Sequence, residues 1–343
     1  MATIGQTNPT LLDCAKALDP DGKIARIVEV LTQTNEILED AVWKEGNLPT
    51  GHRTTIRTGL PQVYWRLLNQ GIPPSKSSLA QVDEGTAMLE ALSEVDTRLL
   101  ELNAGNAAAH RLTEDMAFLE AMNQTMATTL IYGSAANPAS FVGLSPRYST
   151  RNPAVPNSVN VLNGNGTGSD NTSIWLVGWG DSTVHGIYPK GSSAGFSAND
   201  EGEDWTTDPQ GGRYKVARTH YKWDCGLVVQ DWRYVVRIAN VDKSDLSALT
   251  GTQALTAPTN IIRLMLRAID RLPSTRNCRP AFYVSRDVAS LLTIHAMERT
   301  SNVLAIQPGH SQLGQDIFTL RLKGVPIRIA DVLAADEALV PNV

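Results

Sequence analysis

The sequence is poor in cysteine and in aromatic residues: 3 of its 343 residues are cysteine, and 6% are aromatic. Cys14, Cys225 and Cys278 are scattered along the chain, and no two of them have the spacing of a metal-binding or redox motif. Such a pattern is typical of proteins that fold in a reducing compartment. We therefore expect free thiols and no disulfide bonds.

The sequence also lacks a long apolar run, since none approaches the roughly 18–20 residues that span a bilayer. Its first residues, MATIGQTNPTLLD, contain no basic stretch followed by an apolar one, so no signal peptide is expected. These absences predict a protein that makes no contact with a membrane.

An excess of positive charge is missing too. The formal net charge is −5, whereas dedicated nucleic-acid binders concentrate Lys and Arg to neutralise phosphates. This charge is compatible with a protein that lies near DNA without binding it tightly, and it is equally compatible with an ordinary enzyme. The 26 Gly and 18 Pro indicate many turns in a globular chain.

Helical spacing of apolar residues is clearest over 107–131, where it predicts a long helix with Leu119 on its buried side. Residues 87–102 have a period near 3.5 and are predicted as helix, although their first part could instead be the return strand of a hairpin. Further helices are expected from Gly22 to about Gly46, over 258–272, and over 286–299 with Ser285 as N-cap.

Residues 52–82 differ from the helical segments, because polar, basic and apolar residues alternate there as in a strand. We expect an extended hairpin, and an isolated hairpin is only marginally stable in water. Later strands are predicted over 173–180, 185–189, 212–223, 226–241 and 281–284, with a polar excursion at 190–212 and a C-terminal hairpin turning at Gly324. The mixed order of helices and strands predicts an α+β fold.

One motif has the pattern of a catalytic site. GSSAG at 191–195 matches the nucleophile elbow of serine hydrolases, with Ser193 as nucleophile, but that motif needs a strand before it and a helix after it. Pro189 precedes it and no helical period follows, so we expect a plain loop. A serine hydrolase that uses Ser193 remains the alternative from another functional class.

Metal and phosphate sites have little support. The acidic run Asp200, Glu201, Glu203 and Asp204 could offer oxygen ligands to calcium, but it lacks the spacing of an EF-hand loop. GNGTG at 164–168 lacks the GK[ST] ending of a phosphate-binding loop. The six histidines include no HExxH motif and no pair at i, i+4. We therefore predict no catalytic, cofactor-binding or metal-binding residues.

Three groups of side chains leave alternatives open. Lys76, at the expected hairpin tip, is either a solvated residue or the donor of an isopeptide cross-link to a neighbouring subunit. The basic residues His52, Arg53 and Arg57 form either a solvated strand face or cationic partners for acidic patches on adjoining subunits. The methionines at 116, 122 and 126 are predicted as core filler.

Several collinear segments resemble a known family. LEAMNQTMATTLIYGSAANPASFVGLSPRYS is similar to the long helix and following segment of major capsid proteins from short-tailed bacteriophages, particularly the Epsilon-fifteen-like kind. HGIYPKGSSAGF and WDCGLVVQDWRYVVRIANV resemble their large central region. EGNLPTGHRTTIRTGLPQVYWRLLNQGIPPSKSSLAQVDEGTAMLEA resembles their extended hairpin.

The resemblance implies the Hong Kong 97-type capsid fold. Its parts would map onto an N-terminal arm with a helix at 1–50, an extended loop at 51–85, a peripheral domain at 86–133 with a spine helix at 107–131, an axial domain at 134–310, and closing peripheral strands at 311–343.

The resemblance also implies a function. The chain would be a non-enzymatic subunit that forms hexamers and pentamers of an icosahedral shell around double-stranded DNA, assembled in the host bacterial cytoplasm. A separate scaffolding protein, a portal protein and a cement or decoration protein are the expected partners, and DNA would be contacted non-specifically. Another virion component, such as a tail-tube or connector protein, is the alternative of similar kind.

Overall fold

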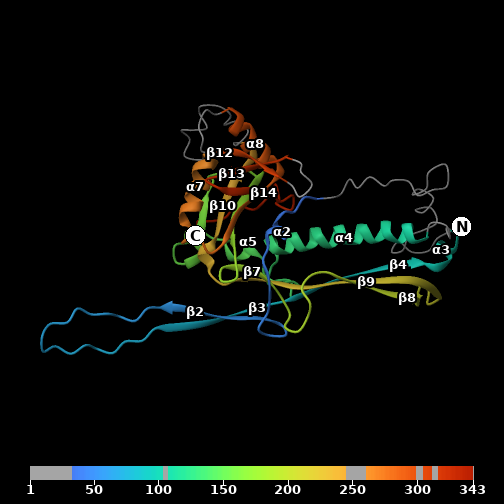
Figure 1. Ribbon diagram of the computed structural model, residues 1–343, viewed down its shortest axis with the longest axis horizontal. Helices are drawn as coiled ribbons and strands as arrows, with labels where there is room; N and C mark the ends of the chain where they lie inside the picture. Colours follow the sequence, from blue (N-terminus) through green and yellow to red (C-terminus); the bar gives the residue numbers. More distant parts are fainter. Residues whose placement is uncertain (1–32, 103–106, 245–259, 299–303, 311–315, 343) are drawn as a thin grey trace.

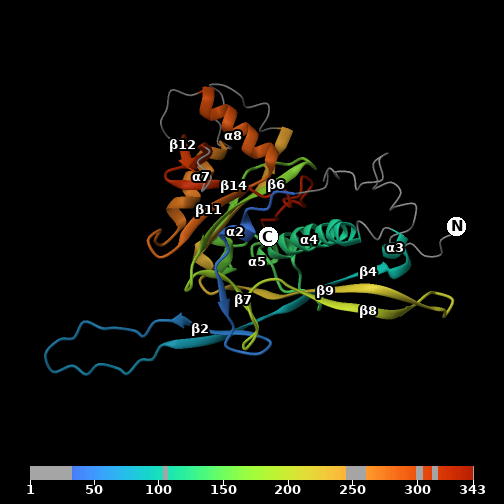
Figure 2. The ribbon, with the colours of Figure 1, turned by 45° about the vertical axis from the view of Figure 1, so that its right-hand side comes forward.

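The computed structural model describes residues 33–102, 107–244, 260–298, 304–310 and 316–342. A compact body of helices and strands carries two long projections that point in opposite directions (Figure 1). One projection is a bare hairpin, and the other is a helix lying along three strands. The view turned by 45° shows the same arrangement (Figure 2).

The body is built on a buried strand, β6 (Asn171–Trp179), whose nine residues are all buried. It lies between two antiparallel neighbours, β10 (Val235–Asp242) and β11 (Arg279–Val284). The sheet continues from β11 through β14 (Val325–Ile329) and β13 (Asp316–Leu322) to β12 (Leu304–His310). On the other side it passes through β7 (Val184–Tyr188) to β9 (Arg213–Val229).

Shorter elements complete the body and its connections. They are α2 (Ile37–Asp40), β1 (Trp43–Glu45), α5 (Leu144–Arg147), the 3-10 turns Pro156–Asn160 and Trp232–Tyr234, and β5 (Val161–Asn163).

Two helices of the body match their predicted positions, α7 (Ile261–Arg271) and α8 (Arg286–Glu298). The Asn260 side chain caps α7 by accepting hydrogen bonds from the backbone N–H groups of Ile262 and Arg263. Ser285 lies at the expected position before α8, but its hydroxyl has no hydrogen-bond partner in the described part of the chain. The prediction that Ser285 caps α8 through its side chain is therefore wrong.

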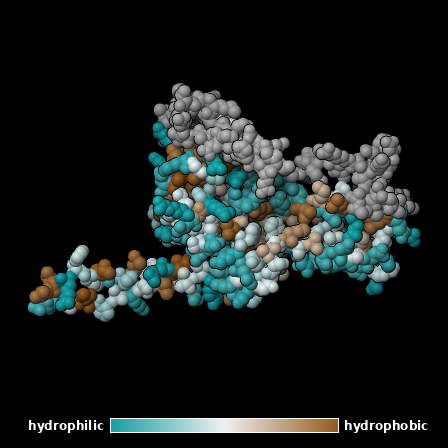
Figure 3. All heavy atoms as spheres, in the orientation of Figure 1, coloured by the Kyte–Doolittle hydropathy of each residue, from teal (hydrophilic) through white to brown (hydrophobic). Residues whose placement is uncertain are grey.

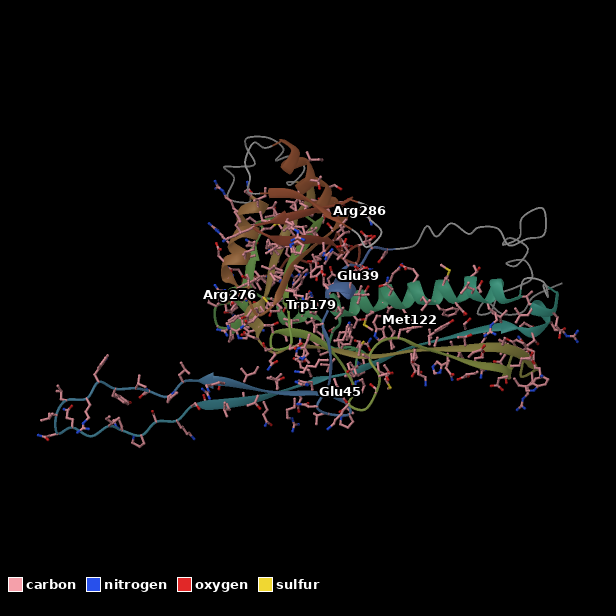
Figure 4. All side chains as sticks on the ribbon, in the orientation of Figure 1. Glu39, Glu45, Met122, Trp179, Arg276 and Arg286 are labelled. Carbon is pink, nitrogen blue, oxygen red and sulfur yellow. The ribbon has the colours of Figure 1, made fainter. Side chains whose placement is uncertain are left out.

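The second projection holds the predicted long helix, α4 (Ala107–Tyr132). At about 1.5 Å per residue it is about 39 Å long. Below it run β4 (Ala87–Asp96), β9 and β8 (Ser197–Thr207), with β9 between the other two and antiparallel to both. A short helix, α3 (Thr97–Leu102), follows β4. Met122 is buried between α4 and these strands (Figure 4).

Several predicted elements are corrected. Residues 87–96 form strand β4, as the alternative interpretation allowed, and only Thr97–Leu102 is helical. The polar excursion contains strand β8, which cross-strand ion pairs hold against β9. Trp232–Tyr234 is a turn rather than strand. Of the helix expected before Gly46, Ile37–Asp40 is helical, β1 follows, and residues 22–32 lie outside the described ranges.

The burial of α4 also differs from the prediction. Leu119 is 41% exposed and Met116 is 52% exposed, so neither contributes to the core as expected. Met122 and Met126 are buried, which confirms the core interpretation for these two methionines. The helix ends at Tyr132, and at Gly133, which follows it, an added Cβ would lie 2.3 Å from the carbonyl oxygen of Phe141.

Candidate assembly surface

The first projection is a hairpin whose outer part has no partner in the described chain. Strands β2 (Gly51–Gly59) and β3 (Ser78–Gly85) pair in an antiparallel register, and residues 60–77 extend beyond them without regular structure. We call residues 60–77 the extended tip. Its large apolar side chains are all exposed: Leu60, Val63, Tyr64, Trp65, Leu67, Leu68 and Ile72.

The exposure of the extended tip is close to complete. Trp65 is 104% exposed and Leu68 is 91% exposed, and brown apolar spheres line the projection in the space-filling view (Figure 3). Exposed apolar surface that is gathered on one segment of a soluble protein marks a contact site. The tip is therefore the strongest candidate for a protein interface in the described part of the chain.

The base of the hairpin is held firmly to the rest of the molecule. Glu84 accepts two hydrogen bonds from the guanidinium of Arg147, one of them 2.7 Å long, and the two side chains are only 10% and 16% exposed. Such a bidentate pair is the strong form of ion pair. The two strands of the hairpin also pack closely on each other at this point, because a Cβ on Gly51 would lie 2.1 Å from the carbonyl oxygen of Glu84. The hairpin direction is thus fixed from its base.

The basic residues of β2 have different environments. Arg53 donates two hydrogen bonds to Asp83 on the opposite strand, at 2.6 and 2.7 Å, so its charge is matched within the hairpin. Arg57 is exposed, and so is Lys76 at the extended tip. The sequence analysis left open a solvated strand face or pairing with adjoining subunits, and it did not predict the pairing of Arg53 within the hairpin.

His52 has the least expected position, because its ring meets that of His185 edge-to-face with centroids 5.7 Å apart. His185 is fully buried, and neither of its ring nitrogens has a hydrogen-bond partner among the described residues. Burial lowers the pKa of His185 to about 4, with smaller contributions from His52 and Lys44. Burial likewise lowers the pKa of His52. Both rings are therefore neutral in the folded chain near pH 7.

Ser193 lies in an exposed turn between β7 and β8. The segment after it is strand β8 rather than a helix, and Gly191 and Gly195 on either side have positive φ values of 84° and 95°. The strand–turn–helix geometry that exposes an activated serine is therefore not formed at this motif.

The acidic run is neutralised by basic side chains of α4 and β9. Its pairs are Asp200 with Arg111, Glu201 with His220 and Arg218, Glu203 with Lys215, and Asp204 with Arg218. Within the described ranges, no group of three His, Cys, Asp or Glu side chains could hold a metal ion. The carboxylates thus stabilise the strand layer under α4.

The glycines of GNGTG provide close backbone packing. The N–H groups of Gly164 and Gly166 donate to the carbonyl oxygens of Ala239 and Asn240, at 2.7 and 2.8 Å. A Cβ on Gly164 would lie 2.5 Å from the Asn240 oxygen. This segment leads into β6 rather than opening a helix, so it does not have the geometry of a phosphate-binding loop.

A buried charge network that sequence reasoning missed joins the C-terminal segment to both parts of the molecule. Glu337 accepts hydrogen bonds from Arg237 on β10 at 2.9 Å, from Tyr132 at the end of α4 at 2.5 Å, and from Ser173 on β6. Arg237 and Glu337 are 4% and 7% exposed. No local sequence motif predicts such an ion pair, because Arg237 and Glu337 are 100 residues apart. The network fixes α4 relative to the body.

Comparison with known proteins decides the family. The model of the major capsid protein GP7 family matches residues 19–341. The chain belongs to this capsid protein family. No curated protein matches the chain.

One solved structure supports the family assignment, and two more distant ones are also similar. A chain in the structure of bacteriophage Epsilon15 is 32% identical, with a TM-score of 0.79 and 99% of each chain covered. The bacteriophage JBD30 capsid is 10% identical, with a TM-score of 0.46, 89% of this chain and 93% of that chain covered. Gordonia phage Cozz gives 14% identity and a TM-score of 0.41, with 69% and 99% covered. The last two TM-scores are too low to support an argument.

The family match confirms three predictions made from the sequence: the α+β class, the Hong Kong 97-like fold, and the role of major capsid protein of a bacteriophage. The chain is a structural subunit of the virion that assembles with its own copies into the capsid. Among the described residues, no helix is long and apolar enough to cross a membrane.

Proposed function

We propose that copies of this chain form hexamers and pentamers of a closed icosahedral shell, and that the extended tip makes the main contact between neighbouring subunits. The observation that carries the proposal is the exposed apolar surface of residues 60–72 on a hairpin with a rigid base. Burial of one large apolar side chain contributes about 1.5–3 kcal/mol. Several such side chains from each copy supply a substantial association energy.

The shape of the subunit favours repeated contacts over a single dimer interface. The extended tip lies far from the body, at the end of a projection (Figure 1). A contact between the tip of one copy and a different surface of the next copy is heterologous, and heterologous contacts form closed rings and shells when the geometry closes. This is the behaviour that a capsid subunit needs.

The finer parts of the function follow from the same proposal. The chain has no catalytic role, which is consistent with Ser193 lying in an exposed turn that leads into a strand. A separate scaffolding protein guides assembly in the host bacterial cytoplasm, and a portal protein is a further partner. A cement or decoration protein is a further proposed partner, and the packaged double-stranded DNA is contacted non-specifically.

Imaging of the purified full-length chain, alone and with its scaffolding protein, tests the proposal. We expect closed shells, whereas rings or tubes without shells would contradict it and favour a connector or tail-tube role. The key variant is Trp65→Ser with Leu68→Ser, and the matched control is Gln70→Ala with Lys76→Ala in the same exposed segment. The first variant should fold normally but give no stable shells, and the control should assemble as the wild type does. Normal shells from the first variant would overturn the role of the tip.

A further inference from the structure

The apolar stripe along α4 is covered at one end and bare at the other. Leu130 and Met126, near the C-terminal end, are 1% and 2% exposed. Leu119, Met116 and Leu112 continue the same stripe toward the N-terminal end and are 41%, 52% and 63% exposed. Apart from Asn123, the stripe is apolar from Leu112 to Leu130. Its exposed part is suited to an apolar partner.

The strand layer below α4 does not cover this bare part, because the strands contact a different face of the helix. Phe118 stacks on Tyr221 of β9, with ring centroids 6.1 Å apart, and Arg111 hydrogen-bonds to Thr219 of the same strand at 3.0 Å. At about 100° per residue, Met116 lies roughly 160° around the helix from Phe118. Met116, at the centre of the bare stripe, therefore faces away from β9.

The described chain begins at this stripe. The backbone N–H of Gln33 donates to a carboxylate oxygen of Glu120 at 2.9 Å, and Glu120 is four residues after Met116 on α4. A few residues later, Ile37 is 0% exposed and belongs to the same core cluster as Met126 and Leu130. Gln33 therefore lies beside α4 at Glu120, next in the chain to Leu119, where the exposed part of the stripe begins.

The sequence before Gln33 fits the bare half in pattern and length. Ile24, Ile27, Val28 and Leu31 have helical spacing. Residues 24–31 in a helix would extend about 10 Å, the same length as α4 between Leu112 and Leu119. Leu31 is two residues from Gln33, so its Cα lies within about 7.6 Å of the Gln33 Cα. Chain connectivity alone therefore keeps this segment near the bare half of the stripe.

We propose that residues 24–31 dock as an amphipathic helix on Leu112, Met116 and Leu119 of the same chain. Docking would remove apolar surface of both partners from water, and it would align the N-terminal segment with the long helix. The inference concerns a contact within one subunit, so it does not depend on whether or how shells form.

Disulfide trapping tests the contact in the full-length chain. In a background with Cys14→Ser, Cys225→Ala and Cys278→Ser, the test pair is Val28→Cys with Met116→Cys. The control pair is Val28→Cys with Ala121→Cys, because Ala121 is exposed on the opposite side of α4. Mild oxidation should join the test pair within one chain at least tenfold faster than the control pair. Covalent dimers from the test pair, or equal rates for the two pairs, would overturn the proposal.

Limited digestion with trypsin gives a second test, in which the native cysteines need not be replaced. Arg26 lies in the middle of the segment, so docking should protect the bond after it. Leu112→Gln with Met116→Gln should raise the cleavage rate at Arg26 at least tenfold, whereas Ala117→Gln with Ala121→Gln should leave it unchanged. An equal cleavage rate in the wild type and the first variant would contradict docking on the stripe.

Discussion

The body and the extended tip use the same kinds of residue in opposite ways. Trp175 and Leu176 of β6 are 0% and 1% exposed, whereas Trp65 and Leu68 of the tip are 104% and 91% exposed. The body buries its apolar residues within one chain, and the tip cannot. The difference teaches that stability and assembly reside in separate parts of the subunit, so substitutions should separate the two properties.

The largest expected effect is on the body. Glu337→Ala removes the carboxylate that accepts hydrogen bonds from Arg237, Tyr132 and Ser173. An unpaired buried guanidinium costs about 3–5 kcal/mol of unfolding free energy. Urea denaturation of the soluble subunit should show this loss.

The control for that variant is Asp270→Ala, which breaks an ion pair with Lys323 whose side chains are 65% and 59% exposed. Pairs of this kind contribute about 0–1 kcal/mol. Equal losses in the two variants would contradict the role of the buried network.

A leucine in each region sharpens the comparison. Leu176→Ala should lower the free energy of unfolding by about 2–5 kcal/mol, because it leaves a cavity in the buried sheet. Leu68→Ala should change it by less than about 0.5 kcal/mol, as expected for an exposed site, but should lower the yield of shells. Urea denaturation and counts of assembled particles measure the two properties for both variants. A large stability loss in Leu68→Ala, or normal stability with few shells in Leu176→Ala, would contradict the separation of stability and assembly.

The sequence predicted some of these elements almost to the residue. The helix predicted over 107–131 is Ala107–Tyr132, and the hairpin turning at Gly324 joins β13 to β14. Both depend on local signals: apolar spacing, and a residue at the turn that tolerates positive φ. The extended hairpin was also predicted from a local signal, the alternation of polar, basic and apolar residues over 52–82.

Other elements depended on contacts between distant segments. Strand β8, SANDEGEDWTT, has low strand propensity, and its pairing is stabilised by ion pairs to Arg218 and Lys215 of β9. In β4, apolar residues spaced three and four apart gave the pattern that is typical of a helix. The segment is nevertheless a strand, and it buries Ser93 and Val95 at alternate positions. The exposure of Leu119 could not be predicted correctly, because helical periodicity shows which residues share a face of the helix but not whether another element covers that face.

A smaller, pH-dependent effect is expected where the hairpin meets the body. Burial lowers the pKa of His185 from its ordinary 6.5 to about 4, and the groups facing it are His52, Lys44 and Asp181. The unfolded chain binds a proton here that the folded chain does not. Stability is therefore full above about pH 6.5 and falls by up to about 1.4 kcal/mol per pH unit as the pH drops toward 4.

Urea midpoints between pH 7 and pH 5 measure this effect. His185→Asn should be less stable at pH 7 but should lose less on acidification than the wild type. Parallel pH profiles for the two proteins would show that His185 is not responsible.

The smallest expected effect is at Lys76, which is exposed at the extended tip. We expect shells that separate into single-chain bands on boiling in detergent, in the wild type and in Lys76→Ala alike, because a solvated Lys forms no covalent bond. A ladder of multimers that disappears in Lys76→Ala would show instead that the tip is cross-linked.

A reconstruction of the assembled particle by electron cryomicroscopy tests the central claim most directly. The account predicts that residues 60–72 are ordered in the shell, with Trp65 and Leu68 buried against an adjacent subunit. A shell in which these side chains remain in solvent, or in which the tip folds back onto its own chain, would contradict it.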